Sequence, residues 1–461
     1  MLDPSDGQPF AAIARGRAED VAEAVAAARA AADGGAWSRL APAERGRLLA
    51  RFAQAIGEHA GQLASLEGKD CGKPTRQARA DVAACARYFE FYAGACDKLH
   101  GTTIPYLPDY QVLTVREPHG VTGHIIPWNY PLQIFGRSVG GALAAGNACV
   151  VKPAEDACLS LLQLAELAAA VGFPPGALNV VTGYGHEAGA ALASAQGIDH
   201  LSFTGSAGIG RLIAQAAAMR HVPVTLELGG KSPQIVFADA DLDRALPTIV
   251  NAIIQNAGQT CSAGSRLLVE ASRYPEVLDR LAERFRSLHA GPASLDLDLG
   301  PLIRASQLER VRGFVSGLPR QPGQGAWIRA EGQIAPEAPS GGFYFAPTLV
   351  ADARPGEALA CEEVFGPVLA AMPFRDESEA IALANATDYG LVAAVWTQDG
   401  GRALRLTRAI RSGQVFINCY GAGGGIELPF GGVKSSGYGR EKGFEALYGF
   451  TTLKTITIFH G

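Results

Sequence analysis

The stretch VTGHIIPWNYPLQIFGRSVGGALAAGNACVVK, residues 121–152, decides the fold class of this chain. Its apolar run VTGHII ends at the motif PWNYP, apolar residues at helical spacing begin near Leu132, and a second apolar run, NACVVK, follows. Two strands joined by a helix in this way form a parallel pair, with the helix crossing one face of the sheet. The stretch therefore predicts an α/β fold of the nucleotide-binding type.

The alternation of strands and helices continues downstream. The apolar runs LNVVTG, DHLSFTG and VPVTLEL alternate with helical segments at about 159–171, 187–194 and 208–219. A second alternating region has a helix from Leu242, the strand RLLVE and a helix at about 275–288. Two successive alternating regions predict two α/β units in one chain.

Upstream, helical spacing predicts helices at 18–32, from Pro42 and at 76–99. The segment YQVLTVREPHGVTGHII then predicts two strands around a Pro-His-Gly turn. Later in the chain, the Gly- and Pro-rich segment LPRQPGQGAWIRAEGQIAPEAPSGG predicts a loop and an edge strand.

Bulk properties limit the class of protein. A chain of 461 residues with 48% hydrophobic and 18% charged residues is typical of a globular protein of two or three domains. The net charge of -5 and the lack of a basic block give no reason to expect nucleic acid as a partner. No apolar run is long enough for a membrane span, and the first residues predict no signal peptide. The eight cysteines show no metal-ligand spacing, so we expect no metal and a cytoplasmic location.

The stretch NAGQTCSAGSR, residues 256–266, places Cys261 among small and polar residues. A structural cysteine is usually a small buried hydrophobe, whereas Cys261 lies between Thr260 and Ser262, which predicts a polar, accessible setting. The thiolate is the reactive form of cysteine, and it can form the tetrahedral adduct from which an aldehyde gives up hydride. Cys261 is therefore a candidate nucleophile, with an ordinary buried cysteine as the alternative.

Two further polar residues follow predicted strands. Asn129 lies between a strand and a helix, where its amide either donates to an oxyanion or caps the turn. Glu227 ends an apolar strand beside two glycines. Apolar surroundings raise the pKa of a carboxyl group, which suits a general base. The alternative is that Glu227 is a solvated glutamate at a strand end, with no such role.

Two glycine-rich stretches compete as phosphate-binding loops. FTGSAGIGR, residues 203–211, predicts a strand followed by glycines at the start of a helix, where backbone N–H groups suit a pyrophosphate. VVTGYGHEAG, residues 180–189, is closer to the dinucleotide fingerprint in spacing. A lone near-match of that kind is usually a tight loop, so the first stretch is the favoured site.

Five motifs, taken in order, resemble those of the NAD(P)-dependent aldehyde dehydrogenase superfamily. They are PWNYP at 127–131, TLELGGKSP at 225–233, NAGQTCSAGSR at 256–266, EEVFGPV at 362–368 and LPFGGVKSSGYGRE at 428–441. The resemblance covers the chain from about residue 10 to the C-terminus. It implies an enzyme that oxidises an aldehyde to the carboxylic acid with NAD as cofactor.

The resemblance also implies a fold of three parts. They are a Rossmann-type NAD-binding domain at 1–100 and 121–228, an α/β catalytic domain at 229–426, and a small β oligomerisation element at 101–120 and 427–461. Such elements pair subunits in the family, so we expect a homodimer or homotetramer.

Roles for the catalytic residues follow from the same resemblance. Cys261 would attack the aldehyde, Asn129 and the backbone N–H of Cys261 would stabilise the oxyanion, and Glu227 would activate water to hydrolyse the thioester. Relatives that pass the acyl group to CoA lack this glutamate, so its presence favours water as the acceptor. A non-catalytic protein on the same scaffold would show an eroded site, yet all three residues are present.

The resemblance places the cofactor phosphates near Ser206. It places Lys152 and Glu155 at the adenosine ribose, and it places Glu363 and Phe365 at the nicotinamide ribose and ring. The carboxylate of Glu155 would repel a 2′-phosphate, so we expect NAD to be preferred over NADP. The full set expected to bind the cofactor is Ile126, Pro127, Trp128, Lys152, Glu155, Gly205, Ser206, Leu228, Glu363 and Phe365.

The expected substrate residues are Tyr130, Gln133, Arg137 and Gln255, of which Gln133 and Arg137 share one helix face. Relatives resembling succinate-semialdehyde dehydrogenases carry an arginine at the position of Arg137, and it binds the remote carboxylate of the substrate. Their second arginine, six residues before the nucleophile, is Gln255 here. We therefore expect a semialdehyde with a polar or anionic tail. There are two alternatives. Arg137 is a structural arginine paired with a neighbouring acid, or the substrate is an aromatic or general aldehyde that the glycine-rich loop 418–427 admits.

Overall fold

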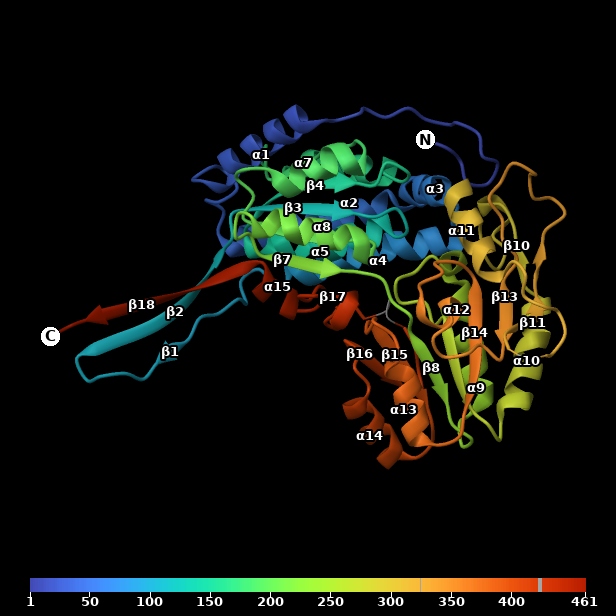
Figure 1. Ribbon diagram of the computed structural model, residues 1–461. Coiled ribbons are helices and arrows are strands. Elements are labelled where there is room, and N and C mark those ends of the chain that lie inside the picture. The colour runs from blue at the N-terminus through green and yellow to red at the C-terminus, as the bar shows by residue number, and fades with distance from the viewer. Residues whose placement is uncertain (324, 422–424) are drawn as a thin grey trace.

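Two large β-sheets organise the chain in this computed structural model, which describes residues 1–323, 325–421 and 425–461 (Figure 1). The first sheet has six strands in the order β17-β7-β6-β3-β4-β5, and neighbours run parallel except at β17. Its strands are β3 (Val121–Ile126), β4 (Ala148–Pro153), β5 (Leu178–Val180), β6 (His200–Thr204), β7 (Val224–Glu227) and β17 (Gly437–Tyr438). The predicted α/β fold class is confirmed.

The order of the strands defines a ligand site at the first sheet. From β3 the chain proceeds outward to β4 and β5, and it then returns to the other side of β3 for β6 and β7. The crevice at the carboxyl ends of β3 and β6 is therefore a topological switch point, where open α/β sheets bind their ligands. The motif PWNYP follows β3, and Gly205 follows β6, so both lie at this point.

Helix α5 (Pro131–Ala145) sets the position of the segment that follows β3. Pro131 stands at its first position, where the missing N–H costs nothing. The helix packs closely against α4 (Thr75–Ala93), because a Cβ at Gly136 would lie only 3.0 Å from Tyr88. The other helices of this part are α1 (Ala18–Ala32), α2 (Pro42–Glu58), α3 (Ala60–Cys71), α6 (Leu159–Ala170), α7 (Ala190–Ser194) and α8 (Ala207–Ala218).

The second sheet has seven strands in the order β11-β13-β14-β9-β8-β15-β16. Its strands are β8 (Pro233–Val236), β9 (Arg266–Glu270), β11 (Trp327–Glu331), β13 (Thr348–Ala351), β14 (Val368–Phe374), β15 (Val392–Trp396) and β16 (Gln414–Ile417). Its helices are α9 (Leu242–Ile254), α10 (Tyr274–Arg286), α11 (Ala305–Val315), α12 (Ala358–Cys361), α13 (Glu377–Asn385) and α14 (Gly400–Ala409). Strand β11 lies at the edge, as the Gly- and Pro-rich segment predicts, although Gln324 of that segment lies outside the described residues.

Short elements complete the described chain. They are the 3₁₀ turns η2 (Gln255–Gly258), η3 (Ala293–Leu295) and η4 (Lys434–Ser436), the π-helical turn η1 (Gly185–Gly189), the parallel pair β10 (His289–Ala290) and β12 (Gln333–Ile334), and α15 (Glu445–Gly449). Two predicted helices differ at their ends. The helix expected at 76–99 ends at Ala93, and the one expected at 187–194 starts as η1 and continues as α7.

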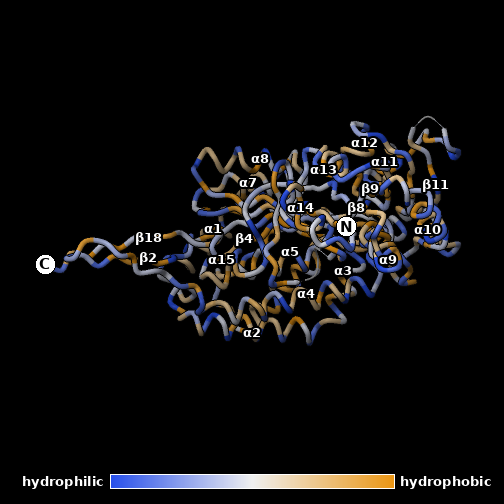
Figure 2. Tube along the Cα trace, turned by 90° about the horizontal axis from the view of Figure 1, so that it is seen from below, coloured by the Kyte–Doolittle hydropathy of each residue, from blue (hydrophilic) through white to orange (hydrophobic). Residues whose placement is uncertain are grey.

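A three-stranded arm projects from the body (Figure 1). It consists of β1 (Thr103–Ile104), β2 (Tyr110–Pro118) and β18 (Thr451–Phe459), all antiparallel, with β18 at one edge. Hydrophobic residues recur along it (Figure 2). Large apolar side chains are exposed there. They include Ile104, Tyr106, Leu107, Leu453, Ile458 and Phe459.

The division predicted from the sequence into three parts is kept as a proposal. The predicted boundary between the NAD-binding domain and the catalytic domain, at residues 228 and 229, falls between β7 and β8. Two contacts concern the predicted assignment of the N-terminal segment and of the C-terminal tail. The backbone N–H of Phe343 donates to the carbonyl of Pro4 at 3.1 Å, so the N-terminal segment contacts the second unit. From the C-terminal tail, β17 joins the first sheet beside β7, not the arm.

Candidate active site

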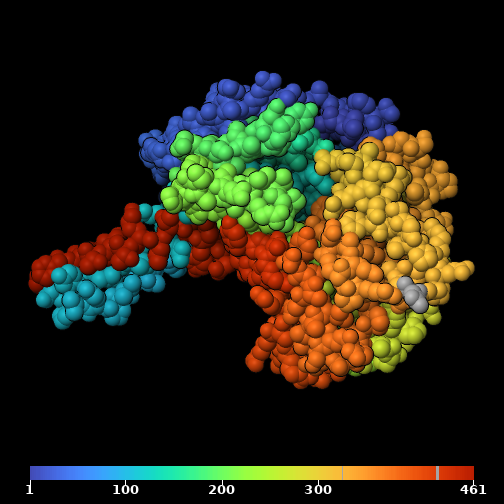
Figure 3. All heavy atoms as spheres, viewed as in Figure 1, coloured from blue at the N-terminus to red at the C-terminus, as the bar shows by residue number. Residues whose placement is uncertain are grey.

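A cavity of about 850 Å³ lies at the switch point of the first sheet. Figure 3 shows the surface hollowed between the green segment around α8 and the yellow and orange segments of the second unit. Nine of the ten residues expected to bind the cofactor line this cavity, and they come from both units. They are Ile126, Pro127, Trp128, Lys152, Glu155, Gly205, Ser206, Glu363 and Phe365.

Leu228 is the expected cofactor residue that does not line the cavity. Its side chain is buried against Gly210 of α8, and its backbone N–H donates to the carbonyl of Ser436 at 3.1 Å. The competing glycine-rich stretch does not line the cavity either, although the N–H of Gly185 donates to the Glu155 carboxylate at 3.5 Å. A Cβ at Gly183 would lie 2.5 Å from the carbonyl oxygen of Gly16, so that glycine allows two loops to approach closely.

The amino end of α8 supplies the phosphate-binding features expected of a dinucleotide site. Ser206 caps this helix by accepting a hydrogen bond from the N–H of Ile209 at 3.4 Å. Residues 205–209 line the cavity, and the amino end of a helix carries partial positive charge. Arg211, which the sequence did not single out, also lines the cavity and adds a cation there. These groups fit the pyrophosphate of NAD.

Lys152 and Glu155 form an ion pair at 2.9 Å on the wall of the same cavity. Burial raises the pKa of Glu155, but the hydrogen bond and charge of Lys152 outweigh it, so the net pKa is lower than usual. Glu155 is therefore held as a carboxylate, an acceptor for ribose hydroxyls.

The turn that carries Glu363 and Phe365 is held from two sides. Phe365 has a left-handed φ of 57°, and Gln307 of α11 donates to its carbonyl at 2.8 Å. Arg310 of α11 donates to the carbonyl of Glu363 at 2.7 Å. The Glu363 carboxylate accepts from the N–H of Gly230 at 3.0 Å, and burial raises its pKa to about 7. Gln307 and Arg310 were not expected from the sequence, because they act on this turn only through the tertiary packing of α11.

Cys261 lies where the cofactor cavity meets a second, smaller cavity, and it lines both. It follows the turn η2, in which Asn256 and Ala257 have left-handed φ values of 49° and 53°. Such a conformation costs a non-glycine residue about 1–2 kcal/mol, so the surrounding structure must hold it. The Asn256 side chain does so by donating to the carbonyl of Asn129 at 2.9 Å, which also ties the cysteine loop to PWNYP.

Cys261 is accessible from both cavities, as the sequence predicts, but its setting is less polar than its sequence neighbours suggest. The thiol is partly buried and packs against the cluster of Leu391, Val392 and Phe430. Burial raises its pKa to about 12, and the guanidinium of Arg137 opposes that rise. Thr260 and Ser262 also line the smaller cavity, but the apolar residues that pack against Cys261 come from other elements.

Asn129 is buried, and its amide nitrogen donates to the carbonyl of Gln259 at 2.9 Å. An amide nitrogen carries two hydrogens, so one donor remains for another acceptor. In the described part of the chain its amide oxygen has no hydrogen-bond partner. Asn129 lines both cavities together with Cys261, as an oxyanion donor must.

Glu227 ends β7 and is 1% exposed. Neither of its carboxylate oxygens has a hydrogen-bond partner among the described residues. Burial raises the pKa of Glu227 well above its ordinary value, and Arg137 opposes the rise, as the apolar strand predicted. The carboxyl group lies against Gly431, where an added Cβ would approach one of its oxygens to 2.8 Å. Glu227 lines the cofactor cavity with Cys261.

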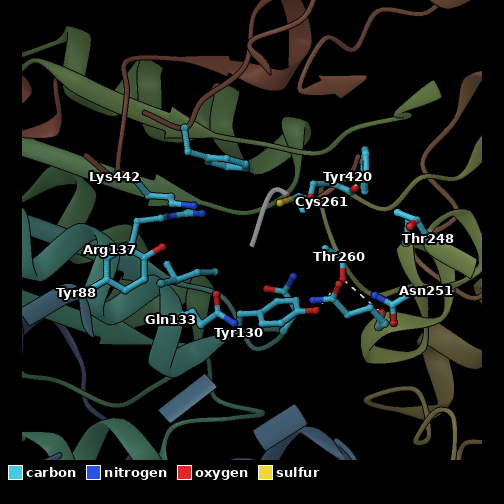
Figure 4. Close-up of a pocket in the computed structure, with 17 residues that line it drawn as sticks. Tyr88, Tyr130, Gln133, Arg137, Thr248, Asn251, Thr260, Cys261, Tyr420 and Lys442 are labelled. Carbon is cyan, nitrogen blue, oxygen red and sulfur yellow. Dashed lines mark hydrogen bonds between the residues drawn. The ribbon is translucent and has the colours of Figure 1, made fainter. Parts of the chain in front are cut away.

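The smaller cavity, of about 100 Å³, is lined by all four residues expected to meet the substrate: Tyr130, Gln133, Arg137 and Gln255. Figure 4 labels the first three of them together with Cys261. Aromatic and polar side chains complete its wall. They include Tyr88, Thr248, Asn251, Tyr420, Phe430 and Lys442. The glycine-rich loop 418–427, expected to widen the entrance, lies in part outside the described residues.

An outer cavity of about 640 Å³ shares Tyr130, Gln133 and Gln255 with this smaller cavity and leads outward between α4 and α9. At their junction, Gln133 donates to Asp81 at 2.6 Å, and Asp81 pairs with the buried Lys73. The shared residues show that the outer cavity adjoins the smaller cavity that Cys261 lines.

Arg137 already has an acidic partner within the protein. Its guanidinium forms an ion pair with the buried Glu441 and donates to Thr204 at 3.1 Å. It also lies over the ring of Phe430 at 5.0 Å. These contacts agree with the alternative interpretation of Arg137 as an arginine paired with a neighbouring acid. Arg137 also lines the cavity.

The first sheet has a dinucleotide-sized cavity at its switch point, and Cys261 lies between that cavity and a second one. This arrangement is typical of an enzyme that uses a dinucleotide cofactor. The sequence model of the aldehyde dehydrogenase family matches residues 1–456. The chain belongs to the aldehyde dehydrogenase family.

Individual relatives agree with this assignment. Aldehyde dehydrogenase family 2 member B4, mitochondrial, from Arabidopsis thaliana is 43% identical over 460 residues, which are 99% of this chain and 84% of that protein. A solved structure from Burkholderia cenocepacia, named as an aldehyde dehydrogenase, is 66% identical with a TM-score of 0.97, covering 100% of this chain and 96% of that one. PnpE from Pseudomonas sp. WBC-3, solved with nicotinamide adenine dinucleotide, is 41% identical with a TM-score of 0.95, covering 99% and 93%.

The protein is therefore an NAD-dependent aldehyde dehydrogenase. Within the described ranges, no helix has the length and hydropathy that crossing a membrane requires. The same ranges hold no group of three or more His, Cys, Asp or Glu residues suited to a metal ion.

Proposed function

We propose that Cys261 is the nucleophile, Asn129 the oxyanion donor and Glu227 the general base of a hydrolytic aldehyde dehydrogenase. The observation that carries this proposal is the position of Cys261 at the junction of the cofactor cavity and the substrate cavity. A group that must bond to the substrate while the substrate gives hydride to the cofactor has to face both.

In the first step the Cys261 sulfur bonds to the aldehyde carbon, and the carbonyl electron pair moves to oxygen. The second N–H of the Asn129 amide and the backbone N–H of Cys261 stabilise that oxyanion. Burial raises the pKa of Cys261 and so favours the thiol, and the thiol proton must therefore pass to water before the thiolate attacks. The guanidinium of Arg137 favours the resulting thiolate.

In the second step the C–H bond of the adduct breaks, and the carbonyl reforms as a thioester on Cys261. NAD, when bound, supplies the hydride acceptor. Glu363 and Phe365 would orient the nicotinamide end, and the amino end of α8 would hold the pyrophosphate.

In the third step Glu227 takes a proton from water, the hydroxide attacks the acyl carbon, and the Cys261 thiolate leaves. A raised pKa makes Glu227 a stronger base once it is ionised. Its lack of hydrogen-bond partners among the described residues supports this role, because the carboxylate is not engaged in holding the fold.

The test is NADH formation with a panel of aldehydes, with and without CoA, in wild type and Cys261→Ser. Hydrolysis predicts that the free acid forms at a rate independent of CoA, and that the serine variant forms no NADH. Turnover that requires CoA would instead assign an acylating dehydrogenase. Absence of NADH with every aldehyde would assign a non-catalytic protein on this scaffold.

For the substrate we propose a semialdehyde with a polar or anionic tail. The cations and amides around the smaller cavity support it, while the ion pair of Arg137 with Glu441 reduces the charge that Arg137 offers. The aromatic alternative is favoured by the wall formed by Tyr88, Tyr130 and Phe430. Comparing kcat/KM for succinic semialdehyde, pentanal and benzaldehyde separates the two.

We also propose that the protein is a homodimer or homotetramer in the cytoplasm. The projecting arm exposes large apolar side chains and the edge of β18, and both are features that subunit contacts cover. All eight cysteines lie in the described ranges and are free, which agrees with a reducing compartment.

A further inference from the structure

Three charged side chains are buried together next to the smaller cavity. Lys73 donates to Glu67 at 2.9 Å and forms an ion pair with Asp81, and all three residues are buried. Burial alone lowers the pKa of Lys73, but the charges of Asp81 and Glu67 outweigh burial, so the net pKa is raised. Buried charges are costly even when they are paired, and none of the three proposed steps of the reaction uses these groups. The cluster therefore calls for an explanation.

The cluster holds two residues that line the smaller cavity. The Lys73 ammonium lies over the Tyr130 ring at 4.1 Å. One oxygen of Asp81 pairs with Lys73, and the other accepts from the amide nitrogen of Gln133 at 2.6 Å. Figure 4 shows Tyr130 and Gln133 side by side, at the edge of the space that Cys261 also faces. The buried charges therefore fix this part of the cavity wall.

The partner of Gln133 decides which end of its amide faces the substrate. A carboxylate that is paired with an ammonium only accepts hydrogen bonds, so the amide can meet Asp81 only through its nitrogen. Asp81 lines the outer cavity and not the smaller one, whereas Gln133 lines both. The amide oxygen, on the other branch of the same carbon, is then directed toward the smaller cavity. It has no hydrogen-bond partner among the described residues.

A fixed acceptor discriminates between substrate tails. A hydroxyl or amino group can donate to the Gln133 oxygen, whereas an ether, ketone or ester cannot and would leave that oxygen unpaired. A site built to hydrogen-bond a substrate hydroxyl rejects the analogue that lacks it, because the polar group of the protein then loses its contact with water and gains nothing.

We propose that Asp81 is a positioning residue that turns the Gln133 oxygen toward the substrate, where this oxygen accepts a hydrogen bond from the tail of the aldehyde. The inference rests on the proposed function, and it narrows the polar tail proposed there to one that carries a hydroxyl or amino group. Because the bond is made far from the reacting carbon, it should affect KM more than kcat.

The test compares matched substrates that differ in the tail. One pair is 4-(1-hydroxyethyl)benzaldehyde, whose hydroxyl donates, and 4-acetylbenzaldehyde, whose ketone only accepts. A shorter pair is 3-hydroxypropanal and 3-methoxypropanal. Wild type should favour the donor. Gln133→Met removes the amide and should lower the donor-to-acceptor ratio of kcat/KM by about 5- to 50-fold, mainly through KM of the donor.

Asp81→Asn should reverse the preference. The Lys73 ammonium only donates, so it keeps the oxygen of the new amide, and the nitrogen of that amide then faces Gln133. Because two donors repel, the Gln133 amide turns over and presents its nitrogen to the substrate. The donor-to-acceptor ratio should fall by about 10- to 100-fold from wild type. Glu67 remains as a carboxylate partner of Lys73, so the buried ammonium keeps a counter-charge.

A double variant shows whether Asp81 acts through Gln133. In the Gln133→Met background, Asp81→Asn should leave the ratio unchanged, because no amide remains to turn over. A loss of folding stability alone would not produce this dependence. If Asp81→Asn unfolds, Asp81→Ala replaces it. This variant removes the anchor without adding a donor, and it should bring the ratio to that of Gln133→Met.

A matched control is Asp70→Asn. Asp70 is also a buried acidic residue, but it accepts from the N–H of Leu159 at 2.7 Å and lines neither of the two cavities. Its replacement should leave the donor-to-acceptor ratio as in wild type.

A wild type that oxidises neither donor, or that prefers neither donor to its partner, would overturn the inference while leaving the proposed function intact. So would a ratio that Gln133→Met or Asp81→Asn leaves unchanged, or one that Asp81→Asn changes equally with and without Gln133. NADH formation that persists in Cys261→Ser would contradict the proposed function itself. The two failures are therefore distinguishable.

Discussion

Replacing Glu227 by glutamine separates the two halves of the proposed reaction. Glutamine has nearly the same shape and keeps the polar group, but it cannot accept a proton from water. Acylation of Cys261 and hydride transfer do not need this base, whereas hydrolysis of the thioester does. Glu227→Gln should therefore release about one equivalent of NADH per Cys261 in a burst and then turn over slowly.

The magnitude follows from the position of the carboxyl group. A positioned general base contributes about 10²–10⁴-fold, so steady-state turnover should fall by that factor. The carboxyl group makes no hydrogen bond to described residues, so the substitution breaks no such contact. The loss should consequently lie in kcat, with the burst amplitude preserved.

The stability of the variant provides an independent check with a defined sign. Because burial raises the folded-state pKa of Glu227, the folded protein binds a proton that the unfolded chain has released between the ordinary and the raised value. Wild-type stability should thus fall by about 1.4 kcal/mol per pH unit in that window as pH rises. Glu227→Gln lacks this titration, so its unfolding free energy should depend less on pH and exceed that of wild type at the upper end.

Stopped-flow absorbance of NADH measures the burst, and mass spectrometry of the quenched protein measures the acyl group on Cys261. Chemical denaturation across pH measures the stability. Cys261→Ser serves as the control without a burst. A Glu227→Gln enzyme with neither a burst nor an acyl adduct would refute the assignment, as would steady turnover within tenfold of wild type when deacylation limits the rate.

Three further outcomes are expected. Asn129→Ala should lower kcat by about 10²–10³, as loss of an oxyanion donor does; a loss below tenfold with chemistry rate-limiting would contradict the role. Glu155→Gln should raise kcat/KM for NADP relative to NAD by about tenfold, because it removes repulsion of the 2′-phosphate, and an unchanged ratio would show that Glu155 does not face the ribose. Deletion of residues 451–461, which removes β18, should convert the oligomer to a monomer in light scattering, and an unchanged mass would place the subunit contact elsewhere.

The sequence alone was sufficient for the parallel strands of the first sheet, although not for β17, and for most of the residues that line the cofactor cavity. Strands such as 121–126 and 148–153 are recognisable as buried apolar runs, and helical spacing identifies the helix between them. Residues at the carboxyl ends of such strands gather at the switch point whatever the details of packing. The cofactor residues that follow β3, β4 and β6 therefore lie where the motifs indicated.

Leu228 shows where this local reasoning ends. It directly follows Glu227 in the family motif TLELGGKSP, yet successive side chains of an extended chain point to opposite sides. Glu227 lines the cavity, and Leu228 packs beneath α8 against Gly210. Which of two neighbours faces a ligand depends on what covers each side, and that is set by the tertiary structure.

Only the tertiary structure decided the electrostatics of the site. The partners Arg137 and Glu441 are separated by most of the chain, and Lys442 and Phe430 are also distant in sequence from Cys261. No local pattern reports such pairings. The raised pKa of Cys261 likewise comes from burial by distant residues, although its sequence neighbours are polar. Motifs identify reactive residue types because chemistry requires them. Charge balance and burial depend on every group nearby in space, and folding alone brings those groups together.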